Sequence, residues 1–330
     1  MPVRIKDSVI VTGSKQIHND YYIDYFKKKG KDIKSFLINK LGRNIRYHCD
    51  GVSENTITLA AKAVDKLLKK QDICGEDIDM IIFCSQYPEF TVPSQACMIH
   101  NHIEGKKNCF TLDINSNCLG MLRGLDVVNR YFNDKSGKLT KALLIGSDYM
   151  SIHCKDTDVV TYSSLSDGAC AILLEYTDEY ECGVIGSSNR TVSQEVYGCL
   201  YPECGMSSIE NYFGNSIKTS WSNPDLKSII NAMKEALDDV LVKHQISVKD
   251  IDWYCCSQFS LELFKGSYKA CAIPKEKAIY VGDKYGYTGT SSPFFAYTDA
   301  VESGKIKKGN IVLFSSVGIG HSICSMLVRV

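Results

Sequence analysis

The sequence carries no excess charge of either sign, because its 330 residues contain 38 Lys and Arg against 38 Asp and Glu. That balance excludes a strongly basic nucleic-acid binder and a chain dominated by a polyacidic tail. Proline is scarce, with 7 residues, and the hydrophobic content of 44% excludes a disordered or fibrous chain. No run approaches the roughly 20 apolar residues that cross a bilayer, and no signal-peptide core follows the first charges. We therefore expect a globular cytoplasmic protein without a nucleic-acid partner or membrane association.

Paired cysteines are also missing. The 15 cysteines are odd in number, are scattered along the chain and include no CxxC pair. Such spacing argues against a disulfide framework and against structural zinc, which needs short paired spacings. We expect reduced thiols and no metal.

Apolar runs of strand length alternate with amphipathic segments of helix length from one end of the chain to the other. This alternation predicts an α/β fold with largely parallel sheets. The predicted helices include Ile57–Lys70 and Leu226–His244. The predicted strands include Met80–Cys84, Ala142–Ile145, Ala169–Leu174, Ala278–Val281, Ile311–Phe314 and Ser325–Val330.

An internal repeat indicates two similar halves. The block Leu68–Ile73 followed by Asp77–Asp79 matches Leu241–Ile246 followed by Asp250–Asp252 at the same offset, and Cys-Ser-Gln follows each block. We predict an N-terminal half over residues 1–175, a linking or capping insertion over 176–225, and a C-terminal half over 226–330. The insertion is rich in Ser, Asn, Tyr and Gly, and it either covers a substrate tunnel or is an ordinary surface loop.

The segment Phe110–Met121 contains the strongest candidate for a nucleophile. It reads as a strand, a polar turn and a largely apolar helix that begins at Cys118. A thiol at a helix N-terminus is next to the positive end of the helix dipole and to free backbone N–H groups, and both favour the thiolate. Near the other end of the chain, Val317–Gly320 forms a glycine turn whose backbone N–H groups could face a developing oxyanion. No dinucleotide or phosphate-loop fingerprint is present.

Together these motifs resemble the ketoacyl-acyl-carrier-protein synthase III family of thiolase-like condensing enzymes. The nucleophile motif D-x-x-x-x-C-x-G fits Asp113 and Cys118–Gly120, and the DGAGA segment corresponds to Asp167–Ala171. The C-terminal glycine turn and the strand ending L-V-R fit Val317–Gly320 and Leu327–Arg329 without gaps. The motifs span nearly the whole chain in the family's order.

The resemblance implies a thiolase-like fold of two duplicated halves in five layers, α-β-α-β-α. It implies an acyl-Cys118 intermediate whose oxyanion is held by the backbone N–H groups of Cys118 and Ile319. Phe36 and Lys40 fall where the family grips CoA. The implied substrates are CoA or phosphopantetheine thioesters, with no bound cofactor, and the implied assembly is a homodimer. An acyl carrier protein is a possible partner, although Glu262 stands where the family commonly places an arginine that meets the carrier.

The chain departs from the family at two positions of the Cys-His-Asn triad. Ser257 stands at the histidine of the H-Q-A-N segment, and Tyr287 stands at the asparagine of the G-N-T-S segment. In the family, the histidine and asparagine side chains stabilise the enolate that forms when a malonyl thioester loses CO₂. Losing one such donor costs about 10²–10³ in rate. Serine and tyrosine hydroxyls still donate hydrogen bonds, but neither is a ready base near neutral pH. We therefore expect slow or absent malonyl condensation.

The leading hypothesis is an acyltransferase that loads an acyl group onto Cys118 and passes it to an acceptor with its own nucleophile. His321 is the candidate base, as the one histidine in a segment that the resemblance brings near the thiol. The alternative within enzymology is a true decarboxylating synthase in which Ser257, Tyr287 and His321 jointly replace the lost pair. The alternative from another class is a non-catalytic partner subunit of a heteromeric synthase.

Overall fold

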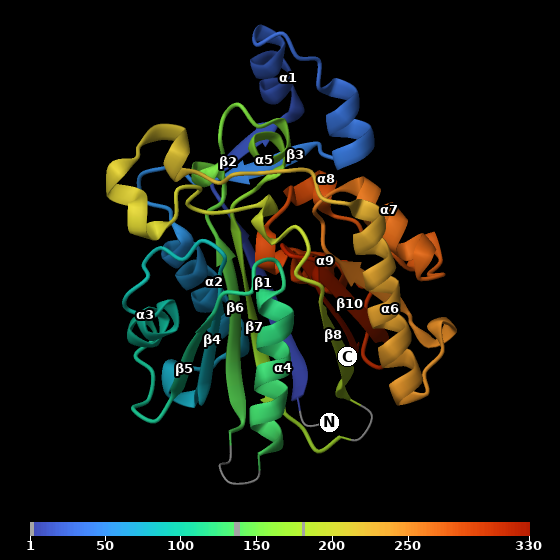
Figure 1. The fold of residues 1–330 in the computed structure, drawn as a ribbon. Coiled ribbons are helices and arrows are strands. Elements are labelled where there is room, and N and C mark those ends of the chain that lie inside the picture. Colours follow the sequence, from blue (N-terminus) through green and yellow to red (C-terminus); the bar gives the residue numbers. More distant parts are fainter. Residues whose placement is uncertain (1–2, 135–138, 180–181) are drawn as a thin grey trace.

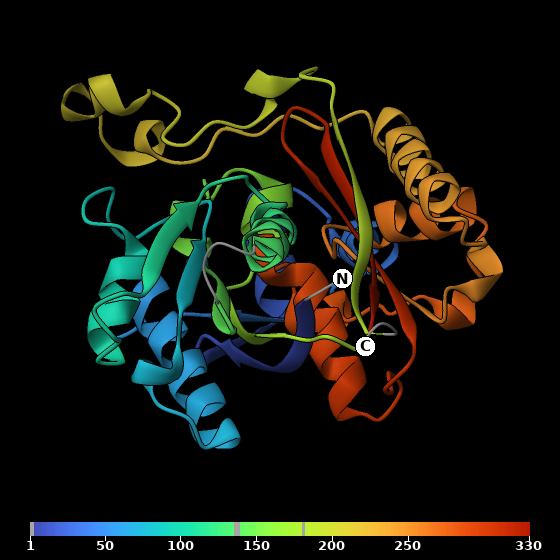
Figure 2. The same ribbon diagram turned by 90° about the horizontal axis from the view of Figure 1, so that it is seen from below.

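Two β-sheets, separated and flanked by helices, make up the computed structural model, which describes residues 3–134, 139–179 and 182–330. Figures 1 and 2 show helices on the outer face of each sheet and a further layer of helices between the sheets. The predicted five-layered α/β architecture is confirmed. Among the described residues, no helix is long and apolar enough to cross a membrane.

The first sheet belongs to the N-terminal half and has five strands. In order across the sheet they are β1 (Val3–Thr12), β7 (Gly168–Tyr176), β6 (Lys141–Asp148), β4 (Met80–Cys84) and β5 (Phe110–Ile114). Strand β4 pairs in parallel with both β5 and β6, and all five of its residues are buried. A continuous apolar run is what a strand covered on both faces requires.

The second sheet has four strands. In order they are β8 (Gly183–Thr191), β11 (Ser322–Arg329), β10 (Ile311–Gly318) and β9 (Trp253–Cys256). Strand β8 pairs with β11, so the second sheet begins well before the boundary predicted at residue 226. The connecting insertion is correspondingly shorter than the predicted 176–225.

The helices are distributed over three layers. The central layer contains α4 (Gly120–Asn133) and α9 (Ser292–Glu302), which share one apolar core with both sheets. The first sheet is covered by α2 (Thr56–Gln71) and α3 (Gln95–His102), and the second by α6 (Leu226–His244) and α7 (Leu261–Ala270). Burial of α4 between two sheets explains why its sequence is apolar on most sides.

The internal repeat is confirmed by the structure. Helix α2 is followed by Asp72 and α6 by Gln245, and both of these capping residues have the left-handed conformation, with φ of 52° and 55°. A one-turn 3₁₀ helix follows each, and then a parallel strand, β4 in the first half and β9 in the second. Equivalent sequence blocks therefore form equivalent structure in the two sheets.

A smaller unit sits on top of the two sheets (Figure 1). Its elements are the hairpin β2 (Lys15–His18) and β3 (Ile45–His48), α1 (Asn19–Lys28), a π-helix (Phe36–Leu41), α5 (Val159–Ser164) and α8 (Gly282–Tyr285). Tyr22, Phe26 and Leu37 form a separate apolar cluster there.

Residues 192–225, which we call the covering segment, run from β8 to α6 across the upper part of the molecule (Figures 1 and 2). The segment contains only short 3₁₀ helices: Val196–Gly198, Met206–Asn211 and Gly214–Ile217. The Tyr201 ring fixes it to the N-terminal half, with centroids 4.9 Å from Tyr87 and 4.4 Å from His153.

One predicted strand is wrong. Ala278 makes a single bridge to Tyr254, and residues 279–281 lead directly into α8. The Val281 N–H donates to the Gln258 side-chain oxygen at 2.9 Å instead of to a neighbouring strand. The run is apolar because it is buried. The periodicity of a sequence alone does not distinguish such a buried segment from a buried strand.

Candidate active site

Cys118 lies on a tight turn between β5 and α4. The preceding Asn117 has a φ of 51°, and α4 begins at Gly120, two residues after the predicted start. A Cβ atom on Gly120 would lie 2.5 Å from the Thr290 hydroxyl oxygen, so only glycine lets the turn approach this close. The Ser316 hydroxyl donates to the Cys118 carbonyl at 2.9 Å and fastens the turn to β10. Both halves of the chain therefore position this residue.

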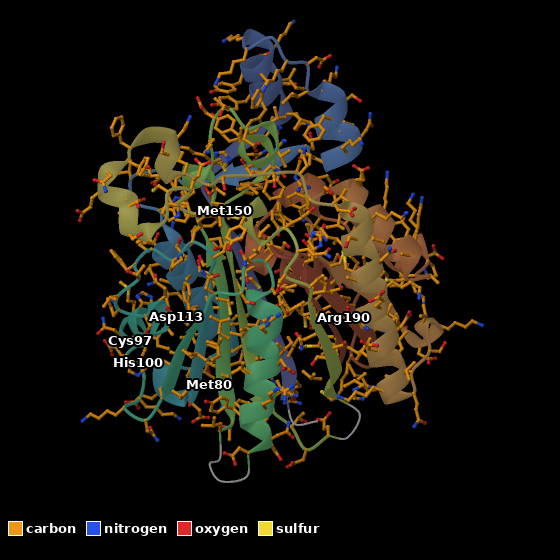
Figure 3. All side chains as sticks on the ribbon, viewed as in Figure 1. Met80, Cys97, His100, Asp113, Met150 and Arg190 are labelled. Carbon is orange, nitrogen blue, oxygen red and sulfur yellow. The ribbon has the colours of Figure 1, made fainter. Side chains whose placement is uncertain are left out.

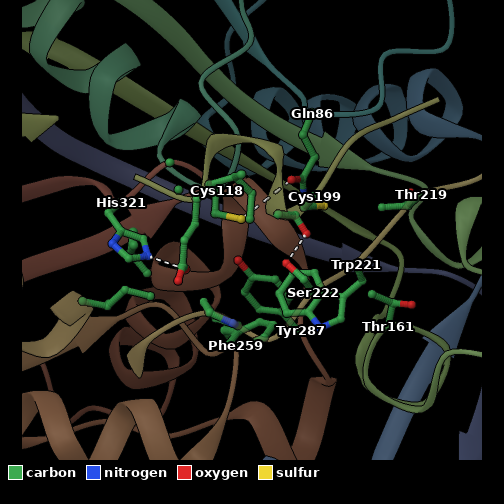
Figure 4. Close-up of a pocket in the computed structure, with 18 of the residues that line it drawn as sticks. Gln86, Cys118, Thr161, Cys199, Thr219, Trp221, Ser222, Phe259, Tyr287 and His321 are labelled. Carbon is green, nitrogen blue, oxygen red and sulfur yellow. Dashed lines mark hydrogen bonds and ion pairs between the residues drawn. The ribbon is translucent and has the colours of Figure 1, made fainter. Parts of the chain in front are cut away.

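A cavity of about 80 Å³ opens at the Cys118 thiol (Figure 4). Most of its wall is apolar, and residues from both halves and from the covering segment line it. The lining includes Gln86, Tyr87, Met150, Leu165, Glu195, Cys199, Thr219, Trp221, Phe259, Tyr287 and Val317–His321. The insertion therefore lines the cavity, and is more than an ordinary surface loop.

Two polar side chains contact the thiol. The Cys118 thiol donates to the Gln86 side-chain oxygen at 3.7 Å, and the Tyr287 hydroxyl, from the opposite half, is near enough to lower the pKa of Cys118. Gln86 follows β4 directly, and Asp148 at the end of β6 accepts hydrogen bonds from the backbone N–H groups of both Gln86 and Thr290. Asp148 thus holds together the two loops that reach the thiol.

Burial, more than the helix N-terminus, sets the ionisation of the thiol. Burial raises the pKa of Cys118 to about 12, against the hydrogen bonds from the Tyr287 hydroxyl and from the Cys118 backbone N–H, which lower it. The nearby Asp148 carboxylate raises it further. Burial therefore opposes the helix terminus, which was expected to keep thiolate present, because desolvation disfavours the charged form of the thiol.

Ser257 is a neighbour of Tyr287 but does not line the cavity. Ser257 is fully buried directly after β9, and its hydroxyl has no hydrogen-bond partner among the described residues. Burial raises the pKa of the neighbouring Tyr287 well above its usual value. The Tyr287 ring packs edge-on against Phe259, with centroids 5.5 Å apart. Of the two residues at the departing triad positions, only Tyr287 lines the cavity.

The glycine turn between β10 and β11 forms the wall of the cavity beside the thiol. Among the hydrogen bonds of the described residues, no oxygen accepts from the Cys118 or the Ile319 backbone N–H. His321 follows the turn, is buried with 3% exposure and lines the same cavity. Its Nε2 atom lies 3.0 Å from a Glu195 carboxylate oxygen.

Phe36 and Lys40 line a second pocket of about 310 Å³, which opens next to the first. The two pockets share a boundary that includes Trp221 and Phe259, whose ring centroids are 5.3 Å apart. The Lys40 ammonium pairs with the Glu262 carboxylate at 3.4 Å.

Asp113 of the nucleophile motif has a structural role. Its two carboxylate oxygens accept from the backbone N–H groups of Gln95 and Ala96 at 2.6 and 2.8 Å. Figure 3 shows it beside α3, next to Cys97 and His100. Asp113 therefore fixes the N-terminus of α3, where a carboxylate is favourable. In the described part of the chain, no group of three or more His, Cys, Asp or Glu residues is placed to hold a metal ion.

Arg43 holds in place the loop that contains Ser257. Its buried guanidinium donates to the backbone carbonyls of Gln258 at 2.8 Å and Phe259 at 2.6 Å. It also donates to the carbonyls of Leu41 at 2.9 Å and Gly282 at 3.3 Å. One side chain thus connects the upper unit to the C-terminal half.

Replacing Arg43 is expected to destabilise the protein strongly. Arg43→Met leaves several buried carbonyls unpaired, at a cost of about 1–3 kcal/mol each, and should lower the midpoint of thermal unfolding by several degrees. The matched control is Arg130→Met, because Arg130 is 71% exposed and, among the described residues, pairs only with Asp126 on the surface of its own helix. Circular dichroism measures both midpoints, and equal midpoints would contradict the bracing role.

Sequence reasoning missed Gln86, Asp148, Glu195 and Trp221. One signal pointed to the first of them: the tripeptide Cys-Ser-Gln ends β4 as Cys84–Gln86 and β9 as Cys256–Gln258. The same tripeptide therefore follows equivalent strands in the two halves, and its glutamine in the first half, Gln86, lines the cavity. Glu195 and Trp221 lie in an aperiodic segment whose path the sequence does not specify.

The chain is similar to known proteins over most of its length. The family model of 3-oxoacyl-[acyl-carrier-protein] synthase III matches residues 112–192, and the model of the C-terminal part of that family matches residues 241–330. A beta-ketoacyl-[acyl-carrier-protein] synthase III of Rickettsia typhi is 32% identical over 283 residues, which cover 86% of each chain.

Solved structures show the same fold. The 3-oxoacyl-[acyl-carrier-protein] synthase III of Aquifex aeolicus superposes with a TM-score of 0.87 at 21% identity, covering 99% of this chain and 100% of its own. A single-residue variant of Xanthomonas campestris OleA superposes with a TM-score of 0.85 at 17% identity, covering 100% of this chain and 99% of its own.

Proposed function

Because the chain belongs to the 3-oxoacyl-[acyl-carrier-protein] synthase III family, we propose that it takes an acyl group from a CoA or carrier-protein thioester onto Cys118 and transfers it to an acceptor. The observation that carries the proposal is the placement of Cys118. Its thiol opens into an apolar cavity beside the Ile319 turn, and Ser257 and Tyr287 stand at the positions where the resemblance implies an imidazole and an amide.

Acylation begins when the Cys118 thiolate attacks the thioester carbonyl. The new C–S bond creates a tetrahedral oxyanion, and we assign its stabilisation to the backbone N–H groups of Cys118 and Ile319, from which no oxygen of the described residues accepts a hydrogen bond. Collapse of this intermediate breaks the original C–S bond and releases the donor thiolate, which takes a proton from water. The product of this step is a thioester on Cys118.

Transfer of the acyl group to the acceptor follows the acylation steps in reverse order, with a different nucleophile. An alcohol, amine or thiol attacks the acyl-Cys118 carbonyl, and collapse of the second tetrahedral intermediate returns the Cys118 thiolate. Decarboxylation is not needed, because the acceptor brings its own nucleophilic atom. Phe36 and Lys40 line the pocket through which the thioester arm would enter.

A decarboxylating synthase is the second candidate, and one observation favours it. Tyr287 lies beside the thiol and Ser257 lies beside Tyr287, so two hydroxyls are near the place where an enolate oxygen would form. Hydroxyls donate hydrogen bonds to an enolate, although neither becomes cationic. Release of CO₂ from a malonyl thioester separates the two candidates.

The pH dependence of acylation tests the state of the thiol. Below a pKa of about 12, the thiolate fraction of Cys118 rises about tenfold for each pH unit. We expect the second-order rate of acylation by acetyl-CoA to rise with that slope between about pH 6 and 9. A rate that is flat over this range would mean that the thiol is already ionised.

Tyr287→Phe is expected to slow acylation about 10- to 100-fold at each pH, because it removes a hydrogen bond to the charged thiolate. Tyr285→Phe is the matched control, since the Tyr285 hydroxyl donates to Asp299 at 2.7 Å and Tyr285 does not line the cavity. Intact mass spectrometry of samples quenched at successive times measures both rates. Equal acylation rates in the two variants would show that the Tyr287 hydroxyl does not assist acylation.

A further inference from the structure

Glu195 is a carboxylate that the covering segment places at the cavity of Cys118. Its side chain is 43% exposed, so it lies at the mouth of the cavity and not in the packed core. An ion pair joins it to His321, which lines the same cavity and is labelled in Figure 4. No other acidic side chain lines this cavity among the described residues.

Both hydrogen bonds to the carboxylate end on one oxygen. Glu195 Oε2 accepts from His321 Nε2 at 3.0 Å and from the Asp225 backbone N–H at 3.2 Å. Among the hydrogen bonds of the described residues, none reaches Oε1. The carboxylate is therefore held in place by one oxygen, while the other is available to a ligand.

The backbone around this pair is held in unfavourable conformations. Ser193, Glu195 and His321 are not glycines, yet their φ values are 61°, 54° and 47°. The Ser193 N–H donates to the Gly320 carbonyl at 2.9 Å, which ties the covering segment to the glycine turn. Left-handed residues of this kind concentrate at functional sites, where the surrounding structure enforces them.

The tyrosine and cysteine side chains that line the cavity besides Cys118 are scarcely ionised near neutral pH. Burial raises the pKa values of Tyr87 and Tyr287 well above their usual range and that of Cys199 to about 11. Asp148 is fully buried and does not line the cavity, and its two oxygens accept four hydrogen bonds. A carboxylate with one free oxygen differs from all of these.

On the basis of the proposed function, we propose that Glu195 is the general base for the acceptor and that His321 is its positioning residue. As the acceptor oxygen or nitrogen bonds to the acyl carbon, its proton passes to Glu195 Oε1. The C–S bond to Cys118 then breaks, and the thiolate takes up that proton, so that the net change is transfer of the acyl group and recovery of the thiol. Because Glu195 belongs to the covering segment, the base is present only when this segment is docked.

The test separates loading of the enzyme from unloading. Acetyl-enzyme is prepared with acetyl-CoA and freed of CoA, and its loss to water and to ethanolamine is followed by intact mass spectrometry. Glu195→Gln should be acetylated at close to the wild-type rate, but should lose the acetyl group about 10²–10³-fold more slowly with both probes. Glu195→Asp, which keeps a carboxylate, should recover part of this loss.

Glu203→Gln is the matched control, because Glu203 lies in the same segment, pairs with Lys155 and does not line the cavity. It should unload like the wild type, with an unchanged thermal midpoint. Equal unloading rates in wild type and Glu195→Gln, whether fast or slow, would overturn the role of Glu195. Absence of any acyl-enzyme in the wild type would instead overturn the proposed function.

His321 has its own test as a positioning residue. His321→Gln keeps an N–H donor near the position of Nε2, whereas His321→Leu removes it. We expect His321→Leu to unload as slowly as Glu195→Gln and His321→Gln to be substantially faster, with loading similar in both. Equal unloading by the two variants would show that the hydrogen bond to Glu195 is not needed.

Discussion

Cys118→Ala is expected to abolish acyl-enzyme formation, lowering the rate of acylation by more than about 10³-fold, as for other enzymes that lose their nucleophile. The thiol is the nucleophile of the proposed reaction, and the residual groups of the site can only bind the thioester. The measurement is the intact mass of the protein after incubation with short-chain and long-chain acyl-CoA. The wild type should gain one acyl group, and the variant none.

The cavity supplies its own control for this experiment. Cys199 lines the same cavity from the covering segment, but it is not on the turn that leads into α4. Cys199→Ala should therefore still be acylated. An adduct that survives in Cys118→Ala and disappears in Cys199→Ala would place the nucleophile on the wrong cysteine, and the absence of an adduct with every donor would favour the non-catalytic partner subunit.

The double variant Ser257→His, Tyr287→Asn is expected to gain malonyl decarboxylation by about 10²-fold or more over the wild type. It introduces the imidazole and amide that the family resemblance implies, and each restored donor to an enolate oxygen is worth about 10²–10³ in rate. Removing the Tyr287 ring also clears space beside Ser257, which is otherwise fully buried. Release of labelled CO₂ from malonyl-CoA measures the effect.

Ser257→Ala, Tyr287→Phe is the matched control, because it removes both hydroxyls without introducing either donor. It should show no gain, and circular dichroism should confirm that both double variants fold. If the wild type releases CO₂ rapidly and the control abolishes that release, the two hydroxyls support a decarboxylating synthase and the transferase proposal fails.

Much of the fold was predictable because it depends on local pattern and on duplication. The run Met80–Cys84 is apolar throughout because β4 is covered on both faces, and the repeat marks β4 and β9 as equivalent strands. The strand predicted over Ala278–Val281 is wrong because a buried side chain, Gln258, takes the hydrogen bond that a strand would use. Such a tertiary contact leaves no periodic trace in the sequence.

The site divides in the same way. Cys118 was predictable from its motif, and its fit to the family pattern also pointed to Ser257 and Tyr287. The ionisation of the thiol was not predictable, since it depends on how completely neighbouring residues exclude water from Cys118. Glu195 was missed because its place beside His321 depends on the path of the covering segment, which packs through scattered contacts such as Tyr201 against His153.

The most direct test of the central claim is to locate the acyl group by tandem mass spectrometry. Trypsin releases residues 108–123 as one peptide, which contains both Cys109 and Cys118. Cys109 therefore serves as an internal control for Cys118. After incubation with acetyl-CoA, the account predicts fragment ions that place the acetyl group on Cys118 and leave Cys109 unmodified. Acetylation of Cys109 alone, or a peptide without any acetyl group, would contradict it.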